Sequence, residues 1–445
     1  MLCARTIALL VLLTLTGCAH HRAVHPDPRH GFSAERLERV TERMRRHVED
    51  GSVAGVVGLV ARHGEVVYET VLGDQDREAK RPMQEDTIFR IYSMSKPVTS
   101  VAAMILVEEG RLRLTDAVDR WLPELANRSV LLAPDGPLDQ TRAANGPITV
   151  RDLLTHTSGL AYTFTSQGPL SEALEARGLL GSGSKLDPDE WMKRLGELPL
   201  LRDPGTRWHY SLSTDVLGVL VARVSGMPLP EFLQARVFGP LGMVDTGFWV
   251  PPEKLDRLAV NYSRDRETGE LGIEDHPRDS DYRQPPSFPS GGGGLVSTAH
   301  DYLRFARMMT EGGALEGVRI LSPKGVALMT SNALWPEERT AAPFGARFFM
   351  MGAGFGLGVS VLEDPGIAAQ YGSVGMNGWG GAASTWYWSD PAEGISAVMM
   401  VQLMNQGPGP SISMDFQTMV YQALERPRSG HHGRHTTRGI RPRRH

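Results

Sequence analysis

The chain has 445 residues, of which 41% are hydrophobic and 22% charged, as in an ordinary globular protein. Its net charge of −4 is uneven: residues 426–445 carry seven arginines and no acid, so the rest carries −11 (−4 minus 7). No basic face recurs in the body of the chain, which excludes a typical nucleic-acid-binding protein. The basic tail itself is predicted to be disordered.

The first residues are predicted to be a targeting segment and not part of the fold. Arg5 supplies the positive charge, residues 7–15 form an apolar stretch too short to span a bilayer, and Leu15-Thr16-Gly17-Cys18 ends it. This ending resembles the lipobox of bacterial lipoproteins. The resemblance implies that residues 1–18 are a signal peptide, that Cys18 is lipidated, and that the protein is exported and anchored on the periplasmic side. Ala19 favours the outer membrane, and a plain secretory signal is the alternative.

Cysteine usage agrees with export. The only cysteines are Cys3 and Cys18. If the first leaves with the signal peptide and the second is lipidated, the mature protein has no free thiol. A disulfide, a cysteine nucleophile and a thiolate metal site are then all excluded.

A tether over residues 19–31 leads into an amphipathic helix near residues 37–48, which ends at Gly51. Two β-rich runs, residues 53–60 and 65–72, flank a hairpin signal. A helix followed by strands and then a buried helix is typical of an α/β or α+β domain.

The stretch from Phe89 to Thr99 contains the first chemical motif, Ser93-x-x-Lys96. Pro97 is tolerated only in the first turn of a helix, so Ser93 is expected at or just before its start. Residues three apart share a helix face, which brings the hydroxyl and the amine within hydrogen-bonding reach. A serine is a weak nucleophile until such a base activates it.

The tetrad alone is weak evidence, because Ser182-x-x-Lys185 repeats the spacing. That copy lies in a glycine- and serine-rich stretch with no strand before it and no apolar helix after it. We therefore predict a loop there. For Ser93 and Lys96 the alternative is two surface polar residues at an ordinary helix start.

The middle of the chain is predicted to be mostly helical and poor in strands. Residues 162–188 and 261–289 are long and polar, as in functional or disordered loops, and residues 215–224 carry an apolar helical stripe. Strands are predicted again late in the chain, at residues 354–359, 383–389 and 395–403. A final helix is predicted at residues 414–424.

We expect a discontinuous α/β domain, with an antiparallel sheet flanked by helices, built from both ends of the chain. Its two parts span about 32–111 and 290–425, and a helical domain, about 112–289, is inserted between them.

Two further motifs are candidates for chemistry. Tyr210 lies at a loop-to-helix junction, where its hydroxyl can move protons in a cleft, although a tyrosine packed in the core is the commoner case. Trp379-Gly380-Gly381-Ala382 precedes a predicted strand. Its glycines let a ligand approach the backbone, so the amides of Ala382 and Ser93 are predicted to form an oxyanion hole. A β-bulge is the alternative.

Taken in order, these motifs resemble the serine β-lactamase and penicillin-binding-protein superfamily. The chain is most similar to its class C β-lactamase-like branch, which includes family VIII carboxylesterases, D-aminopeptidases and D-alanyl-D-alanine carboxypeptidases. The similarity runs from about residue 32 to 424. Other matching stretches are Asp152 to Leu160, Pro204-Gly205-Thr206, Pro240-Leu241-Gly242-Met243 and Gly291 to Ser297.

The resemblance implies that Ser93 is the acylated nucleophile, Lys96 its activator and Tyr210 the proton-transfer partner. His156 is expected to brace a helix end and not to act as the base. Two departures stand out: Leu212 replaces the asparagine that usually ends the tyrosine motif, and Trp379-Gly380-Gly381 replaces Lys-Thr-Gly. Both remove donors for an anionic substrate.

We therefore predict an esterase for neutral acyl esters, acting on a small-molecule ester or amide without a cofactor. One alternative is a β-lactamase or D-amino-acid-specific peptidase acting on peptidoglycan fragments. Another is a non-catalytic penicillin- or wall-binding lipoprotein. No Gly-x-Ser-x-Gly, His-Glu-x-x-His or nucleotide-binding fingerprint is present, so no metal site or nucleotide is implied. The oligomeric state is left open.

Overall fold

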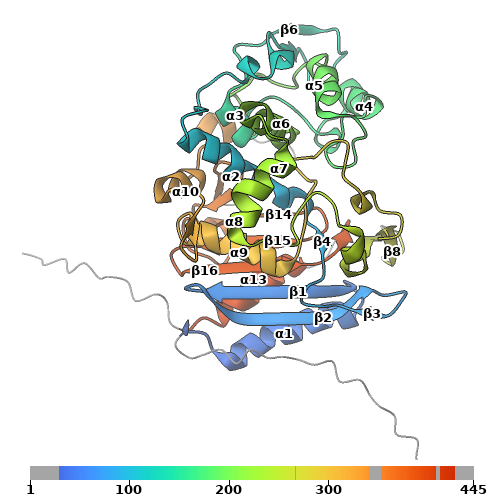
Figure 1. Cartoon of the computed structure of the whole chain (residues 1–445), viewed down its shortest axis with the longest axis vertical. Coiled ribbons are helices and arrows are strands. Elements are labelled where there is room, and N and C mark those ends of the chain that lie inside the picture. Colours follow the sequence, from blue (N-terminus) through green and yellow to red (C-terminus); the bar gives the residue numbers. More distant parts are fainter. Residues whose placement is uncertain (1–29, 266, 340–351, 407–410, 426–445) are drawn as a thin grey trace, which may run out of the picture.

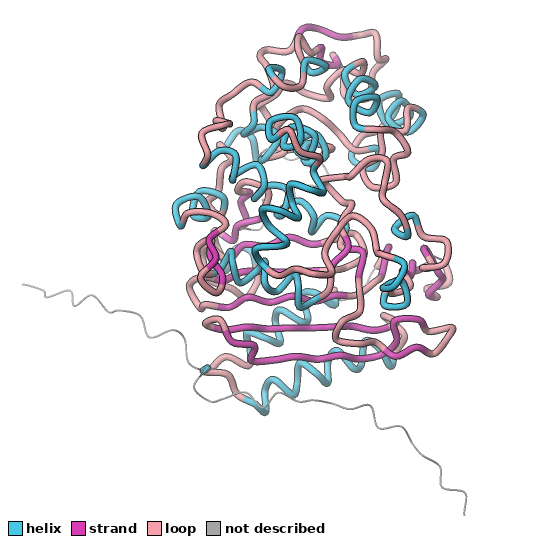
Figure 2. The backbone as a smooth tube through the Cα atoms, viewed as in Figure 1, coloured by secondary structure: helices cyan, strands magenta, loops and turns pink. Residues whose placement is uncertain are grey.

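The architecture is built on one large antiparallel sheet with helices on both faces (Figures 1 and 2). The computed structural model describes residues 30–265, 267–339, 352–406 and 411–425, so Cys18 and the basic tail lie outside the described residues. The strand order is β12-β13-β14-β15-β16-β1-β2-β3. The strands of this sheet are β1 Gly55–Arg62, β2 Glu65–Asp76, β3 Arg81–Pro82, β12 Ala353–Phe355, β13 Ser360–Leu362, β14 Asn377–Gly380, β15 Trp386–Asp390 and β16 Ile395–Met400.

The central strand β1 shows why the sheet needs cover on both faces. All eight of its residues are buried. Because side chains alternate along a strand, Val57 and Leu59 enter the core shared with α2 and α9, whereas Val56 and Val60 enter the core shared with α1 and α13. Two separate layers of helix therefore protect one sheet.

The helices agree well with the apolar stripes of the sequence. In α1, the predicted stripe residues Leu37, Val40 and Met44 are buried against the sheet, and α6 ends at Gly226 with φ +74°. The helices are α1 Ala34–Glu49, α2 Ser95–Glu108, α3 Val150–Leu154, α4 Gly168–Ala176, α5 Pro188–Gly196, α6 Ser213–Ser225, α7 Leu229–Leu233, α8 Gly239–Leu241, α9 Ala299–Thr310, α10 Pro323–Met329, α12 Pro365–Ala368 and α13 Ile412–Gln422.

Both ends of the chain contribute to the sheet, since β16 pairs with β1. Figure 1 shows the blue and orange-red strands side by side, with the teal and green middle of the chain stacked beyond α2. The domain boundaries themselves stay a prediction.

The two long stretches predicted as loops contain regular elements. Residues 162–188 include α4 and the start of α5, and residues 261–289 include strands β7 and β8. The smaller strands are β4 Phe89–Arg90, β5 Ser129–Leu131, β6 Thr141–Ala143, β7 Asn261–Arg264, β8 Leu271–Asp275, β9 Val296–Ser297, β10 Ala314–Leu315, β11 Val318–Arg319 and β17 Leu403–Met404. Strands β7 and β8 were missed because runs of four or five residues carry almost no periodicity. Helix α4 was missed because only Leu170 and Leu174 of its nine residues are buried.

The glycine-rich motif is also placed differently from the prediction. Trp379 and Gly380 belong to β14 itself, and the following strand, β15, begins only at Trp386. Residues 354–359 do not form one strand, because β12 and β13 meet there in a hairpin. Glycine weakens the alternation by which strands are recognised in a sequence, which explains both errors.

No single helix in the described part of the chain is long and apolar enough to cross a membrane. A bent pair, Ser213–Ser225 with Leu229–Leu241 at 79°, reaches that length and composition when both helices are taken together. The first of these helices contributes Val216, Leu217 and Leu220 to the core, so its apolar composition serves packing.

Candidate active site

Ser93 lies where the sheet meets the helical part of the molecule. It belongs to a 3-10 turn, Tyr92–Met94, between β4 and α2, and Met94 is the N-cap of α2. The prediction that Ser93 precedes the helix start is therefore confirmed. Tyr92, directly before it, has φ +41°. A non-glycine residue in this region is strained, and such strain is typical of functional sites.

The structure brings together the three residues predicted to be catalytic. Lys96 Nζ lies 3.1 Å from Ser93 Oγ, and the Tyr210 hydroxyl lies 2.7 Å from the same atom. Both distances are within hydrogen-bonding range. The serine oxygen thus has two partners that can exchange protons with it, one from the first turn of the helix that follows it and one from a segment 117 residues away.

Lys96 is held in a nearly closed environment. Only 1% of it is exposed, and Nζ also donates to the carbonyl oxygen of Gly292 at 2.7 Å. The rings of Tyr210 and Tyr162 have their centroids 4.5 and 5.3 Å from Nζ. The Gly292 carbonyl and the faces of two aromatic rings therefore position the amine next to Ser93.

A buried carboxylate, Asp215, supports this arrangement, although no sequence motif marked it as a site residue. It accepts hydrogen bonds from the Ser290 hydroxyl at 2.5 Å, the Gly292 amide at 3.2 Å and the Tyr162 hydroxyl at 3.1 Å. Burial raises the pKa of Asp215, while the charge of Lys96 lowers it. An acid in the first turn of an otherwise apolar helix was the signal that could have identified it.

His156 braces the segment that carries Tyr210. Its Nδ1 accepts the Ser211 amide at 3.3 Å, its carbonyl accepts the His209 amide, and its ring lies 4.9 Å from the Tyr210 ring. Burial, together with the charge of Lys96, holds the pKa of His156 well below its usual range. A neutral, packed imidazole agrees with the predicted bracing role.

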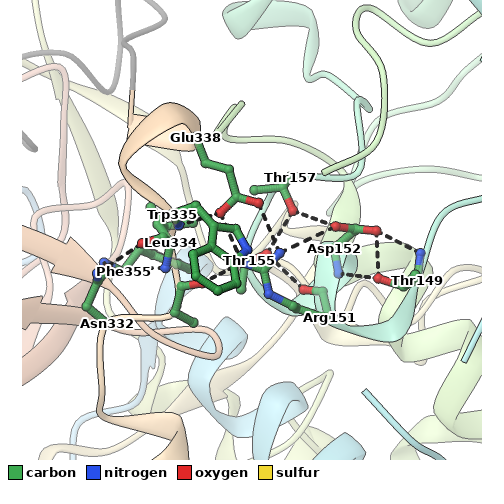
Figure 3. Close-up of polar contacts among 11 residues, drawn as sticks. Thr149, Arg151, Asp152, Thr155, Thr157, Asn332, Leu334, Trp335, Glu338 and Phe355 are labelled. Atoms are coloured by element: carbon green, nitrogen blue, oxygen red, sulfur yellow. Dashed lines mark hydrogen bonds and ion pairs between the residues drawn. The ribbon is translucent and has the colours of Figure 1, made fainter. Parts of the chain in front are cut away.

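The motif around His156 is anchored by a polar cluster that spans distant parts of the chain (Figure 3). Arg151 pairs with Glu338 through both carboxylate oxygens, at 3.0 and 2.9 Å. Asp152 accepts from Thr157 at 2.8 Å. The carbonyl of Glu338 in turn accepts the Trp208 amide at 2.7 Å, so the cluster fixes the chain two residues before Tyr210.

The remaining predicted site residues lie on and after β14. The Trp379 ring centroid is 5.7 Å from that of Tyr210. A side chain at Gly381 would come within 2.4 Å of the Ile91 carbonyl oxygen, so this backbone passes close to the turn of Ser93. Ala382 is exposed beyond the strand. The oxyanion hole of Ser93 and Ala382 stays a prediction.

Neither Leu212 nor the second Ser-x-x-Lys tetrad, Ser182 to Lys185, is placed as a catalytic group. Leu212 is fully buried, so it offers no polar atom to a substrate. Ser182 and Lys185 lie in a loop, as predicted, and line a cavity of about 340 Å³ beside Tyr92. The amine of Lys185 forms an ion pair with Asp281 at 2.7 Å.

One group in the described residues has the composition of a metal site. The potential ligand atoms of Glu69, Glu85 and His300 all lie within 4.8 Å of one another. His300 already bonds to Glu69 at 3.0 Å, and this raises the pKa of His300. The ring nitrogen Nε2 of His300 is therefore already engaged by one of the group's own carboxylates.

The comparisons with known proteins identify the family of the chain. The family model described as Beta-lactamase matches residues 40–412. A Mycobacterium tuberculosis protein, Rv1367c, is 42% identical over 362 residues, covering 81% of this chain and 88% of the relative. Esterase EstB of Burkholderia gladioli is 35% identical over 405 residues, covering 87% and 95%.

Solved structures give the same result. EstCE1, described as a hydrolase with promiscuous acyltransferase activity, aligns with a TM-score of 0.72 at 31% identity, covering 87% of this chain and 98% of that one. A variant of simvastatin synthase from Aspergillus terreus aligns with a TM-score of 0.73 at 27% identity, covering 88% and 98%. The chain therefore belongs to the β-lactamase family, within the superfamily of serine β-lactamases and penicillin-binding proteins, and is a serine hydrolase.

Proposed function

We propose that the protein is a carboxylesterase that hydrolyses neutral acyl esters with small or medium acyl chains. As the Ser93 oxygen attacks the ester carbonyl, its single proton passes to the interacting Tyr210–Lys96 pair, which holds it until the leaving group departs. When the tetrahedral intermediate collapses, the bond to the alkoxy oxygen breaks and Tyr210 returns a proton to the leaving alcohol. Water then attacks the acyl-enzyme and releases the acid.

The observation that carries the proposal is the Ser93 hydroxyl with two proton-exchanging partners at 2.7 and 3.1 Å. The choice of an ester follows from what surrounds it. Leu212 is buried and Trp379 offers only an indole. A β-lactam or a D-Ala-D-Ala terminus carries a carboxylate, and a site without a lysine or an amide at these positions lacks the donors to bind it. The similarity to EstB supports the same choice.

The test compares protein that starts after Cys18 with its Ser93→Ala variant. Both are assayed with p-nitrophenyl butyrate and nitrocefin, and intact mass is recorded after treatment with a fluorophosphonate. We expect butyrate turnover and one covalent adduct, both lost in the variant. Faster turnover of nitrocefin than of butyrate would favour the β-lactamase alternative, and peptidoglycan fragments would test the peptidase. No turnover and no adduct would indicate a binding lipoprotein.

Acyl transfer to an alcohol is a second candidate activity. Relatives of this chain include acyltransferase mokF of Monascus pilosus, at 32% identity, and the Tyr210 ring is surrounded by the rings of Tyr162, Phe164 and Trp379. Apolar walls disfavour water and give an alcohol a surface to bind. Butyl butyrate formed from p-nitrophenyl butyrate and butanol, in excess of the uncatalysed reaction, would support transfer.

We also propose that the protein is exported and anchored to the envelope through a lipid on Cys18. The support comes from the sequence alone, Leu15-Thr16-Gly17-Cys18. Expression of the full chain and of Cys18→Ala in a Gram-negative host, with labelled palmitate and membrane fractionation, tests it. We expect label and outer-membrane association only in the wild type. Equal, unlabelled release of both proteins would indicate a plain secretory signal.

A further inference from the structure

Phe164 is a large apolar side chain at the active site, and 65% of it is exposed. It occupies the middle of a 3-10 turn, Thr163–Thr165. Single exposed hydrophobic residues are common on protein surfaces. The position distinguishes this one, because its ring centroid lies 6.3 Å from that of Tyr210, whose hydroxyl contacts the Ser93 oxygen.

The turn that presents Phe164 is firmly held. Thr165 Oγ1 accepts the Tyr162 amide and donates to the Tyr210 carbonyl, both at 2.9 Å. The Ser166 hydroxyl donates to the Tyr162 carbonyl at 2.7 Å. The turn is therefore tied directly to the backbone of the predicted proton-transfer residue, and Phe164 keeps its place relative to Tyr210.

The ring itself is oriented by stacking. Phe164 lies almost parallel to Tyr162, with 4.9 Å between the centroids and 14° between the planes. Tyr162 is itself buried and anchored to Asp215 by its hydroxyl. The exposed surface of a ring held by such a fixed partner is preorganised to contact a flat apolar group of the substrate.

We propose that Phe164 forms the binding subsite for the alcohol part of the ester, and that it favours flat apolar alcohols over short alkyl ones. The proposal rests on the esterase function above. Tyr210 returns the proton to the leaving oxygen, so during acylation the alkoxy group lies on the Tyr210 side of the carbonyl. Phe164 lies beside Tyr210 on the turn whose Thr165 hydroxyl bonds the Tyr210 carbonyl, whereas the Trp379 ring, 5.7 Å from that of Tyr210, comes from β14, the strand that leads into the predicted oxyanion hole.

The kinetic consequence separates the alcohol from the acyl group. Butyrate esters of different alcohols all form the same butyryl-enzyme, so a residue that touches only the alcohol changes kcat/KM for acylation. It leaves the rate of deacylation unchanged. A residue that touches the acyl chain would change both.

The experiment measures kcat/KM for benzyl butyrate and ethyl butyrate, and for ethyl acetate, with wild type, Phe164→Ala and Phe164→Tyr. We expect wild type to prefer the benzyl ester. Phe164→Ala should lose about five- to tenfold in kcat/KM for that ester and less than twofold for both ethyl esters. Phe164→Tyr, which keeps the ring, should restore the preference. Leu132→Ala, at a position 63% exposed and outside the active-site contacts, is the matched control.

Four results would overturn the inference. Equal losses on benzyl and ethyl butyrate would mean a structural role, and a loss that follows acyl length would place Phe164 on the acyl side. A wild type that turns over both butyrates without preferring the benzyl ester would refute the subsite and leave the esterase standing. If no ester is turned over and Ser93 takes no fluorophosphonate, the proposed function and the subsite both fail.

Discussion

Ser93 is the residue on which the local interactions converge. Its oxygen contacts the amine of Lys96, in the first turn of the following helix, and the phenol of Tyr210, from a distant segment. Lys96 is aimed by the Gly292 carbonyl, and Gly292 is held in turn by Asp215. A chain of short, buried polar contacts thus positions the nucleophile before any substrate binds, which is the preorganisation that acyl transfer requires.

Tyr210→Phe tests the predicted proton transfer most directly. The ring contacts and the backbone hydrogen bond from Thr165 remain, so the fold should be kept. We expect kcat for p-nitrophenyl butyrate to fall about 10²- to 10⁴-fold, the usual contribution of a positioned acid–base group. Tyr162→Phe keeps a ring beside Lys96 and should cost less than tenfold. A Tyr210→Phe enzyme within tenfold of wild type would contradict the assigned role.

Asp215→Asn should change how stability depends on pH. Burial raises the pKa of Asp215 above its ordinary value of 3.8, so the folded state holds this proton more tightly than the unfolded state does. The stability it contributes is present below that value and is lost as the pH rises through the folded pKa. The variant cannot ionise and should lack this loss. Urea unfolding at pH 4, 6 and 8 should show that the free energy of unfolding of the variant increases relative to that of wild type as the pH rises. A difference that stays constant with pH would contradict this.

Among the elements, the glycine-rich segment before β9 and helix α9 has the closest connection to the site. A side chain at Gly292 would come within 2.5 Å of Asp215 Oδ2 and 2.8 Å of the Tyr162 hydroxyl. At Gly293, the nearest atom would be Ser182 Oγ at 3.5 Å, an ordinary contact. A side chain therefore cannot be accommodated at Gly292 without a backbone shift, whereas one fits at the adjacent Gly293.

This contrast gives a matched pair of variants. In Gly292→Ala the segment must move, which displaces the carbonyl that Lys96 uses, so we expect at least a tenfold loss of kcat with KM less affected. Gly293→Ala should stay within about twofold of wild type. Circular dichroism and thermal unfolding show whether each variant is folded. Similar activity in both variants would mean that the Gly292 carbonyl does not position Lys96.

At the scale of the whole molecule, buried neutral histidines should make the fold sensitive to acid. Burial, together with the charge of Arg202, lowers the pKa of His209 from 6.5 to about 4, and His156 is shifted in the same direction. The unfolded chain then binds more protons than the folded one between these values. The free energy of unfolding should therefore fall as the pH drops from 6.5 to 4, by about 3 kcal/mol for His209.

Urea unfolding between pH 7 and pH 4 measures this loss. We expect His209→Gln to flatten the dependence on pH relative to wild type. A pH dependence identical in His209→Gln and wild type would show that this histidine does not titrate as its buried position requires.

Much of this molecule follows from local sequence. The apolar stripes of α1 and α6, the β1–β2 hairpin, and the start of α2 just after Ser93 were all predicted, because each depends on periodicity or on proline and glycine within a few residues. The position of Trp379 in β14 was not predicted, since its neighbouring glycines hide the strand pattern.

The sequence by itself determined the chemical elements of this protein: a serine and a lysine on one helix turn, a tyrosine at a junction, and apolar residues where the family usually has polar ones. Only the tertiary structure decided that Asp215, Tyr162 and the Gly292 carbonyl surround the lysine, and that Phe164 stands beside Tyr210. The physical reason is distance along the chain. Contacts within one helix turn follow from helix geometry, whereas contacts between α2, α6 and the Gly291 to Ser297 segment depend on how the whole core packs.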